Sequence, residues 1–296
     1  MSGASGFIGG SLSSFLREKK HEVFKLVRSG VRDRFSILWD PEKGILEKEA
    51  LAGFDACIHL AGEPLTLTRW NRAKRERILQ SRKKGTLLLS NALSKLSHPP
   101  KFFLSASAVG FYGDREDEIL DEKSSSGKSF LSEVCREWES GSRVLEEKGV
   151  RVVRTRFAVV LGPKGGALQK MLLPYRLGLG GRLGTGRQWM SWVAREDLIR
   201  AIEFILMKEE IRGIVNISSP HPVRQEEFSK TLARVLHRPA FFSVPAWALR
   251  LLLGKTADEM LLMSARVLPR VLESFGFLFQ YPYLERALEK ALSNQS

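Results

Sequence analysis

Apolar positions along the chain follow two alternating patterns. Short apolar, β-branched runs predict buried strands at residues 21–27, 56–60, 101–106, 150–155 and 214–217. Between them, apolar residues recur at helical spacing and predict helices at residues 11–19, 71–96 and 129–148. Strands that alternate with long helices predict an α/β fold, a doubly wound parallel sheet of the Rossmann type.

The pattern changes after residue 155. Residues 162–186 concentrate glycine around a short helix expected at 168–177. From residue 238 onward, helical spacing dominates and predicts helices at residues 246–253, 258–275 and 284–292. The second part of the chain therefore predicts a smaller, mainly helical lobe beside the sheet.

The N-terminus, MSGASGFIGG, carries a glycine-rich loop with Gly3, Gly6 and Gly9 at three-residue spacing. A loop of this kind lies between a buried strand and a helix, and lets the backbone approach a phosphate at the helix N-terminus. The predicted helix follows at once. We expect the cofactor contacts of this loop to come from Gly3, Ser5, Gly6, Phe7, Ile8 and Gly9.

Ligands of doubly wound sheets bind beyond the carboxyl ends of the strands. One predicted strand ends at Arg28, where dinucleotide folds contact the adenine ribose. An acid there binds the 2′-hydroxyl of NAD, whereas an arginine accommodates the 2′-phosphate of NADP, so we predict NADP(H) over NAD(H). The next two strand ends add Leu60, Ala61, Gly62, Glu63 and Ser105 to the expected cofactor contacts.

Composition and charge limit the classes of partner that we expect for this protein. The net charge is +14, but basic residues are mixed with acids and no aromatic residues interleave with them, so we expect no nucleic acid partner. No apolar run reaches the roughly 18 residues of a membrane span, so we expect no membrane partner. Cys57 and Cys135 are the only cysteines, which predicts a cytoplasmic protein without a disulfide framework, and no metal site is expected.

Five segments together resemble a known family: GASGFIG, HLAGEP, SASAVGFYG, VVLGPKGG and GTGRQWMSWVAREDL. They are similar to the extended short-chain dehydrogenase/reductases, and more narrowly to the atypical epimerase-family branch, which is nucleoside-diphosphate-sugar epimerase-like. The resemblance covers nearly the whole chain, and residues 238–292 resemble the small C-terminal domain of that branch. The resemblance implies a nucleotide-binding domain and a small-molecule substrate. It is compatible with a homodimer.

The resemblance also raises a question about the first strand. Family members place an apolar strand of about five residues before the glycine loop. Here only Met1 and Ser2 precede Gly3, and loss of a central strand would expose two unpaired edges. We therefore expect Met1 to be an internal methionine at the end of that strand, with a natural start a few codons upstream. The alternative is a shortened protein that folds poorly.

The family uses a serine, a tyrosine and a lysine four residues after the tyrosine. The resemblance places the serine at Ser107, whereas Phe130 and Val134 stand where the tyrosine and lysine are expected. Phenylalanine carries no ionisable proton, and valine cannot lower the pKa of a neighbour. The standard acid–base pair is therefore replaced.

Three interpretations stay open for the missing pair. Tyr112 acts as the acid from its loop, although we favour a packed aromatic there. Lys128 approaches from the start of the helix, although we favour a solvated lysine more strongly. Alternatively, the protein binds a dinucleotide without standard redox chemistry. Glu63, held at a strand end by Pro64, is a further candidate base, with a structural loop acid as the alternative.

Anion-binding side chains and planar rings gather in the second part of the chain. Arg156, Lys164 and Arg187 are expected in loops that face the cofactor. Trp189 and Trp192 are candidates for stacking on a ligand, with a core position at least as favoured for Trp192, and Asp197 is expected to be structural. We predict that the substrate contacts are Arg156, Arg187 and Trp189.

These expectations combine into one function. Residues 1–155, completed by about 193–220, are expected to form a dinucleotide-binding Rossmann domain, with residues 156–192 and 221–296 as the substrate lobe. The function expected is that of an NADP(H)-binding epimerase or oxidoreductase acting on a nucleotide-sugar or another phosphorylated substrate. The alternative is a catalytically silent dinucleotide-binding regulator, for example of cell division.

Overall fold

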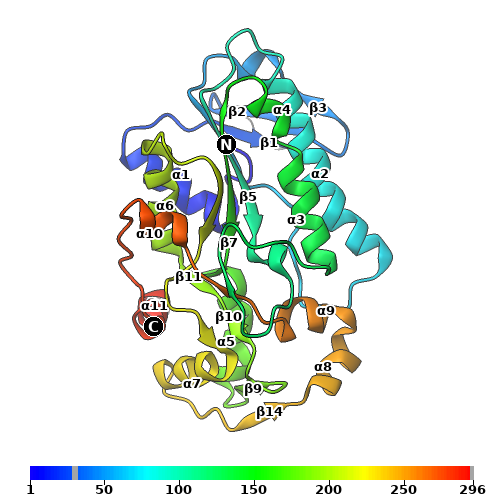
Figure 1. Ribbon diagram of the computed structural model, residues 1–296, viewed down its shortest axis with the longest axis vertical. Coiled ribbons are helices and arrows are strands. Elements are labelled where there is room, and N and C mark those ends of the chain that lie inside the picture. Colours follow the sequence, from blue (N-terminus) through cyan, green and yellow to red (C-terminus); the bar gives the residue numbers. More distant parts are fainter. Residues whose placement is uncertain (29–32, 294–296) are drawn as a thin grey trace.

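A parallel sheet with helices on both faces forms the upper part of the molecule (Figure 1). The computed structural model describes residues 1–28 and 33–293. Four parallel strands are hydrogen-bonded in the order β12 (Gly213–Ile217), β7 (Arg151–Phe157), β5 (Phe102–Ala108) and β4 (Ala56–His59). Beyond them lie β1 (Lys25–Val27) and its parallel partner β2 (Ser36–Asp40), with β3 (Ile45–Leu46) antiparallel to β2. The parallel α/β fold agrees with the prediction.

Alternate residues of the central strands face opposite helical layers, because side chains alternate along a strand. Leu104 and Val153 join the apolar cluster formed with α1 (Phe7–Glu18) and α6 (Arg195–Met207). Phe103 and Val152 join the cluster on the other face, formed with α2 (Arg72–Leu93) and α4 (Arg143–Glu146). The helix α3 (Phe130–Ser140) packs beside α2 (Figure 1).

The lower lobe is built from short elements around a second apolar core that contains Trp192 and Phe228. Its helices are α5 (Gly166–Arg176), α7 (Gln225–Val235), α8 (Ala246–Leu253), α9 (Lys255–Ala257) and, towards the sheet, α11 (Leu284–Leu292). Its strand pairs are β8 (Val159–Leu161) with β11 (Trp192–Ala194), β9 (Gly181–Leu183) with β14 (Phe242–Val244), and β10 (Trp189–Met190) with β13 (Val223–Arg224).

The remaining elements of the described residues lie in the segments between these helices and strands. They are the 3-10 turns Glu49–Leu51 and Val109–Tyr112, β6 (Ile119–Leu120), the π-helical turn Asp258–Leu262, β15 (Arg266–Val267) and α10 (Arg270–Ser274). The strands β6 and β15 pair in parallel across the boundary. No helix among residues 1–28 and 33–293 combines the length and the apolar content that a membrane crossing requires.

Two predicted helices are wrong in extent. The helix expected at 258–275 is divided into the π-helical turn, β15 and α10, because Pro269 has no N–H to continue a helix. The helix expected at 129–148 breaks between α3 and α4, where a side chain on Gly141 would lie 3.1 Å from the Thr86 side chain of α2. Gly141 is the C-cap of α3, and the backbone leaves helical geometry at Ser142, with φ −100° and ψ 1°, before α4 begins.

A cavity of about 710 Å³ lies between β1 and β4. Val23, Leu26 and Ile58 are among the apolar residues that line it. Ser2 bridges to strands on both sides in parallel register, so the first two residues occupy one end of the gap. The Met1 ammonium donates to Phe24 O at 2.7 Å, and burial lowers the pKa of this ammonium. The gap between β1 and β4 therefore has an apolar lining and a desolvated ammonium at one end.

We predict that an apolar extension before Met1 stabilises the protein. About five added β-branched residues would span roughly 17 Å, fill the cavity, pair with both strands and move the ammonium out of the core. The melting temperature should rise by about 5 °C or more. A Gly/Ser extension of equal length is the control, since it moves the charge but leaves the cavity without apolar side chains. Equal melting temperatures for the two extensions would contradict this description of the gap.

Candidate functional site

The glycine-rich loop is pressed against the end of β4. Gly3 has φ +66°, and a Cβ on it would lie 2.9 Å from both Ala61 N and Leu60 C. A Cβ on Gly9 would lie 2.1 Å from Gly3 O. No side chain fits at these two positions, so glycine is what allows the loop to pass against the end of β4 and turn into α1.

The first turn of α1 faces this loop without a side-chain cap. Gly6 is the N-cap residue and has no side chain, the turn carries no acidic residue, and among residues 1–28 and 33–293 no side chain accepts from its N–H groups. Uncapped N–H groups and the positive end of the helix dipole make such a terminus a binding site for an anion. The ring of Phe7, in this turn, packs against the backbone of Gly165 and Gly166, where an added Cβ would lie 2.6 and 2.7 Å from the ring. This packing supports the turn from the side.

A buried histidine fixes the loop to the sheet. The Nδ1 atom of His59 lies 2.7 Å from Ser2 Oγ, which accepts from Leu60 N at 3.1 Å and from Ala61 N at 3.2 Å. Because Ser2 Oγ already accepts two hydrogen bonds, its own proton goes to His59 Nδ1. Burial lowers the pKa of His59 to about 3, so the ring is neutral. This long-range contact has no local signal in the sequence.

The other expected cofactor residues lie at strand ends, except Ser105, which lies within β5. Arg28 is exposed just after β1, and the residues that follow it, 29–32, lie outside the described part. Leu60, Ala61 and Gly62 follow β4 directly. Ser105 lies opposite His59 in the neighbouring strand, and its buried hydroxyl donates to Ala106 O at 3.3 Å. The structure thus brings Leu60 and Ala61 against the glycine loop and leaves the Ser105 hydroxyl in the core.

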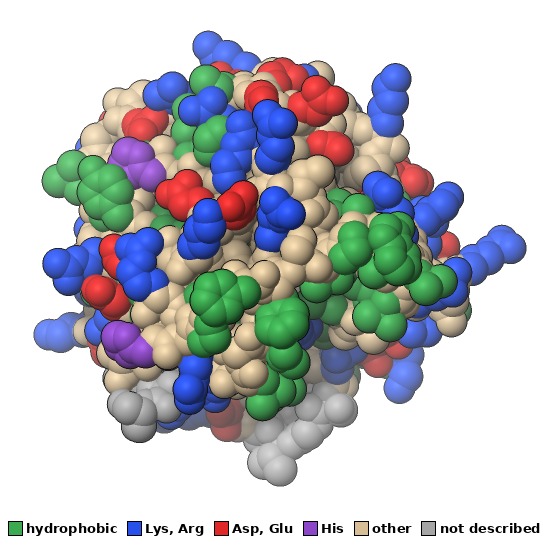
Figure 2. All heavy atoms as spheres, turned by 90° about the horizontal axis from the view of Figure 1, so that it is seen from below, with side chains coloured by type: hydrophobic (Ala, Val, Ile, Leu, Met, Phe, Trp, Pro, Cys, Tyr) green, Lys and Arg blue, Asp and Glu red, His purple; other side chains and the backbone are tan. Residues whose placement is uncertain are grey.

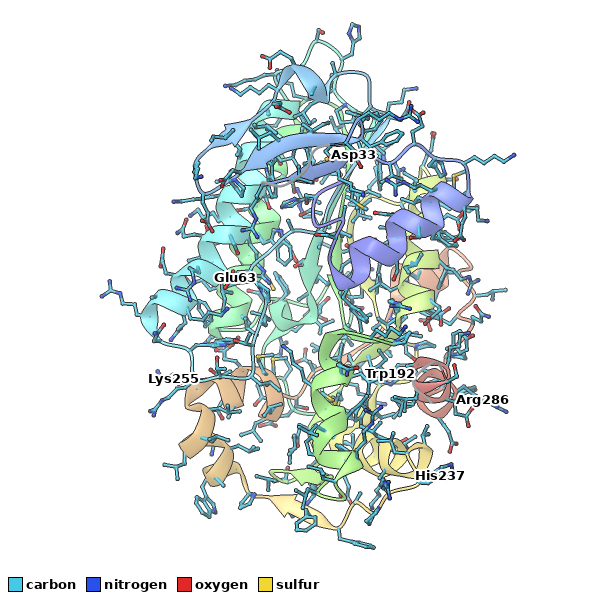
Figure 3. All side chains as sticks on the ribbon, turned by 180° about the vertical axis from the view of Figure 1, so that it is seen from behind. Asp33, Glu63, Trp192, His237, Lys255 and Arg286 are labelled. Atoms are coloured by element: carbon cyan, nitrogen blue, oxygen red, sulfur yellow. The ribbon has the colours of Figure 1, made fainter. Side chains whose placement is uncertain are left out.

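Glu63 is held in a cationic surrounding at the end of β4 (Figure 3). Its Oε1 accepts from Lys74 Nζ at 2.7 Å, and Arg82 donates to its carbonyl oxygen at 3.1 Å. The hydrogen bond from Lys74 is the largest cause that lowers the pKa of Glu63. Glu63 is therefore ionised near neutral pH, and its backbone is fixed by α2.

The expected catalytic residues meet in a buried network. Ser107 Oγ donates to Glu139 Oε1 at 2.7 Å, and Glu139 receives two further bonds from Arg156 at 2.8 and 2.9 Å. Arg156 also donates to Tyr112 Oη at 3.0 Å. Tyr112 is fully buried, its Oη lies 2.8 Å from Asn216 Oδ1, and desolvation raises its pKa to about 12. Tyr112 is thus a packed core aromatic, as the favoured interpretation has it.

The network corrects the expected position of Arg156. This residue lies within β7, not in a loop, and its guanidinium is buried against a carboxylate and a phenol. A bidentate guanidinium–carboxylate pair holds both side chains away from any ligand. Arg156 is therefore not available for substrate contact in this structure.

Phe130 occupies a filled site at the start of α3. The Arg75 guanidinium lies 4.2 Å from the centre of its ring, and Trp70 approaches it edge-on. The Glu259 carboxylate, from the π-helical turn, accepts from Phe130 N at 2.9 Å and from Leu131 N at 3.0 Å. The C-terminal segment thus caps the helix on which the family's tyrosine would stand. Sequence reasoning missed Glu259 because nothing nearby in the chain marks it.

Two other residues of this region, Val134 and Lys128, lie in the core and on the surface, respectively. Val134 is 2% exposed, so it is a core residue of α3. Lys128 is exposed just before the N-cap Ser129, in agreement with the favoured interpretation of a solvated lysine. Neither residue therefore restores the missing acid–base pair.

The expected substrate residues of the lower lobe differ in their surroundings. Arg187 is exposed. Trp189 has the Arg224 and Arg266 guanidinium groups 4.1 and 4.3 Å from its ring centre, and its Nε1 donates to Asp117 at 2.8 Å. Protein groups therefore already occupy the surroundings of that indole. Trp192 is fully buried (Figure 3), and Asp197 accepts from the backbone of residues 280 and 281, so both are structural.

Comparison with known proteins identifies relatives for most of the chain. Residues 1–218 match the NAD dependent epimerase/dehydratase family, and residues 244–291 match a domain of unknown function (DUF1731). Epimerase family protein Mb2239 of Mycobacterium bovis is 38% identical over 97% of this chain and 95% of its own. The chloroplastic SDR39U1 homolog of Arabidopsis thaliana is 38% identical over 97% of this chain and 84% of its own.

Solved structures give the same result. The crystal structure of human epimerase family protein SDR39U1 (isoform 2) with NADPH is 33% identical to this chain. It superposes with a TM-score of 0.90 and covers 99% of this chain and 98% of the human chain.

Gly9 and Gly10 provide a matched test of the loop. Gly9→Ala should destabilise the fold by about 2–4 kcal/mol, because its Cβ meets the backbone at 2.1 Å. Gly10→Ala, whose Cβ would lie 3.8 Å from Ala4 O, should be neutral or stabilising by up to about 1 kcal/mol in α1. Urea unfolding measures both. Similar stabilities for the two variants would show that the loop is not as close as described.

Proposed function

Because the chain belongs to the NAD-dependent epimerase/dehydratase family, we propose that it is an NADP(H)-binding oxidoreductase or epimerase-like enzyme with a small-molecule substrate. The observation that carries the proposal is the uncapped N-terminus of α1 behind Gly3 and Gly9. The backbone can approach a pyrophosphate there without steric conflict, and the free N–H groups bind its charge.

The cofactor we propose is NADP(H), in preference to NAD(H). Arg28 stands exposed at the end of β1, where its guanidinium suits a 2′-phosphate. The human relative was crystallised with NADPH, which supports the same choice. When bound, the nicotinamide would give or take a hydride; the residues of this chain position it and handle the proton.

Proton handling requires a group other than residue 130. We assign this role to Glu63, because it lies two residues after Ala61, which packs against the glycine loop, and its carboxylate pairs with Lys74 Nζ at 2.7 Å. Lys74 orients the carboxylate and keeps it ionised; because the same contact lowers the pKa of Glu63, the carboxylate accepts a proton as a weak base. On the substrate side, Arg187 remains the exposed cation for an anionic group, while Arg156 and Trp189 support the fold.

A second function is favoured by the surroundings of Phe130. Arg75, Trp70 and Glu259 fill and cap the site where the family's acid–base pair would act. A protein that keeps the cofactor loop but fills this site is a candidate for a catalytically silent, dinucleotide-binding regulator. The two proposals share cofactor binding and differ in turnover.

Cofactor preference is tested at Arg28. The unmutated protein should bind NADPH more tightly than NADH, and Arg28→Ala should weaken NADPH about 10- to 100-fold through loss of a charge-assisted contact. NADH affinity should change less than about threefold. Arg286→Ala, which removes a side chain that is 77% exposed on α11, is the control for general charge effects. Equal affinities of the unmutated protein for the two cofactors would contradict the preference.

Turnover separates the enzyme from the regulator. The unmutated protein should oxidise NADPH with at least one member of a panel of sugar-nucleotide and other carbonyl substrates. Glu63→Gln should lower the rate of the reverse reaction, NADP⁺ reduction by the alcohol product, about 100-fold or more, because in that direction the ionised carboxylate accepts the hydroxyl proton as the hydride leaves. Glu76→Gln, an exposed carboxylate on α2, is the matched control. Binding of NADPH without oxidation on any substrate would favour the regulator.

A further inference from the structure

Large apolar side chains gather on the far end of the lower lobe. On α8, Trp247 is 68%, Leu251 75% and Leu252 73% exposed, and at β14 Phe241 is 90% and Phe242 51% exposed. We call these five residues the apolar end surface. Figure 2, which views the molecule from this end, shows hydrophobic side chains in neighbouring groups with Lys and Arg around them. Single exposed leucines are ordinary, whereas a group of this kind marks an interaction surface.

The helix α8 is apolar on both of its faces. Its sequence, AWALRLLL, contains one charged residue, Arg250. Leu249 and Leu253 are buried against the lobe, together with Ala257 and the partly buried Leu183 and Leu262. A helix that is apolar all round normally has apolar contacts all round. The outer face of α8 has solvent instead, so an apolar environment would stabilise it.

The charges beside this surface are mainly positive. Arg250 lies on α8, Lys255 begins α9, and Arg182 and Lys230 lie with Phe241 and Phe242 around one small hollow. The neighbouring acids Asp258 and Glu226 are each paired with one of these cations. With a net charge of +14, a second copy of the chain would bring the same sign of charge to this face. An anionic partner is complementary to it.

The sequence predicted no membrane partner because it contains no spanning segment, and a peripheral contact needs none; we propose that the apolar end surface docks this protein on an anionic lipid membrane. The indole and leucine side chains of α8 enter the boundary between headgroups and acyl chains, and the neighbouring Lys and Arg side chains reach the lipid phosphates. The contact is peripheral, because eight residues of helix span about 12 Å, less than the roughly 30 Å of a hydrocarbon core. The cofactor loop and Glu63 are not part of this surface, so the proposal is independent of the function proposed above.

Vesicle sedimentation tests the docking directly. The full chain should bind vesicles of phosphatidylcholine with about 30% phosphatidylglycerol, bind phosphatidylcholine alone at least about tenfold less, and dissociate in about 0.5 M NaCl. The double variant Leu251→Glu/Leu252→Glu should lower the partition onto anionic vesicles about tenfold or more, because it removes apolar burial and adds negative charge. Both leucines are exposed, so the variant should fold, which its melting temperature checks.

A matched double variant controls for charge. Met207→Glu/Leu278→Glu changes two side chains that are 68% and 78% exposed outside the apolar end surface, and it should lower binding less than about threefold. Equal losses for the two double variants would overturn the proposal, because binding would then depend on net charge alone. Absence of binding to anionic vesicles would also overturn it. So would a dimer, seen by light scattering, that Leu251→Glu/Leu252→Glu dissociates, since the occupant would then be a second copy.

Discussion

The contact between the glycine loop and the end of β4 is the constraint on which the rest of the molecule depends. Gly9 must lie so close to Gly3 O that no side chain fits, and Ser2, bound to the buried His59, sets the depth of the loop. This contact fixes where α1 begins, at the N-cap Gly6, and within the described part of the chain its first N–H groups have no side-chain cap. The proposed cofactor site follows from backbone geometry more than from any functional side chain.

A second buried contact changes the roles of residues that look catalytic. The Arg156–Glu139 pair ties β7 to α3 and recruits Ser107 and Tyr112 as hydrogen-bond partners. Breaking one partner of such a pair leaves an unpaired buried charge, which typically costs about 3–5 kcal/mol. Glu259 then caps α3 from the C-terminal segment, which joins the two lobes next to Phe130. The position of Phe130, where the family has its tyrosine, is thus fixed by side-chain packing and by the Glu259 cap.

Local patterns in the sequence predicted what depends on local physics. Glycine spacing located the loop, apolar runs located the central strands, and the favoured interpretations of Tyr112 and Lys128 agree with their surroundings. Residues whose role depends on distant partners were not predictable. Arg156 seemed to follow a strand that in fact extends two residues further, to Phe157. The contact of His59 with Ser2 and the cap that Glu259 makes on Phe130 join residues 57 and 129 positions apart. The exposed outer face of α8 is equally invisible in the sequence, because its apolar pattern is that of a core helix.

The central claim is that the glycine loop and the first turn of α1 hold the diphosphate of NADP(H). A crystal structure of the protein with NADPH tests it most directly. The account predicts that the diphosphate accepts hydrogen bonds from backbone N–H groups between Gly6 and Gly9, and that the 2′-phosphate meets Arg28. A diphosphate bound elsewhere, or crystals grown in saturating NADPH with no cofactor at this loop, would contradict it.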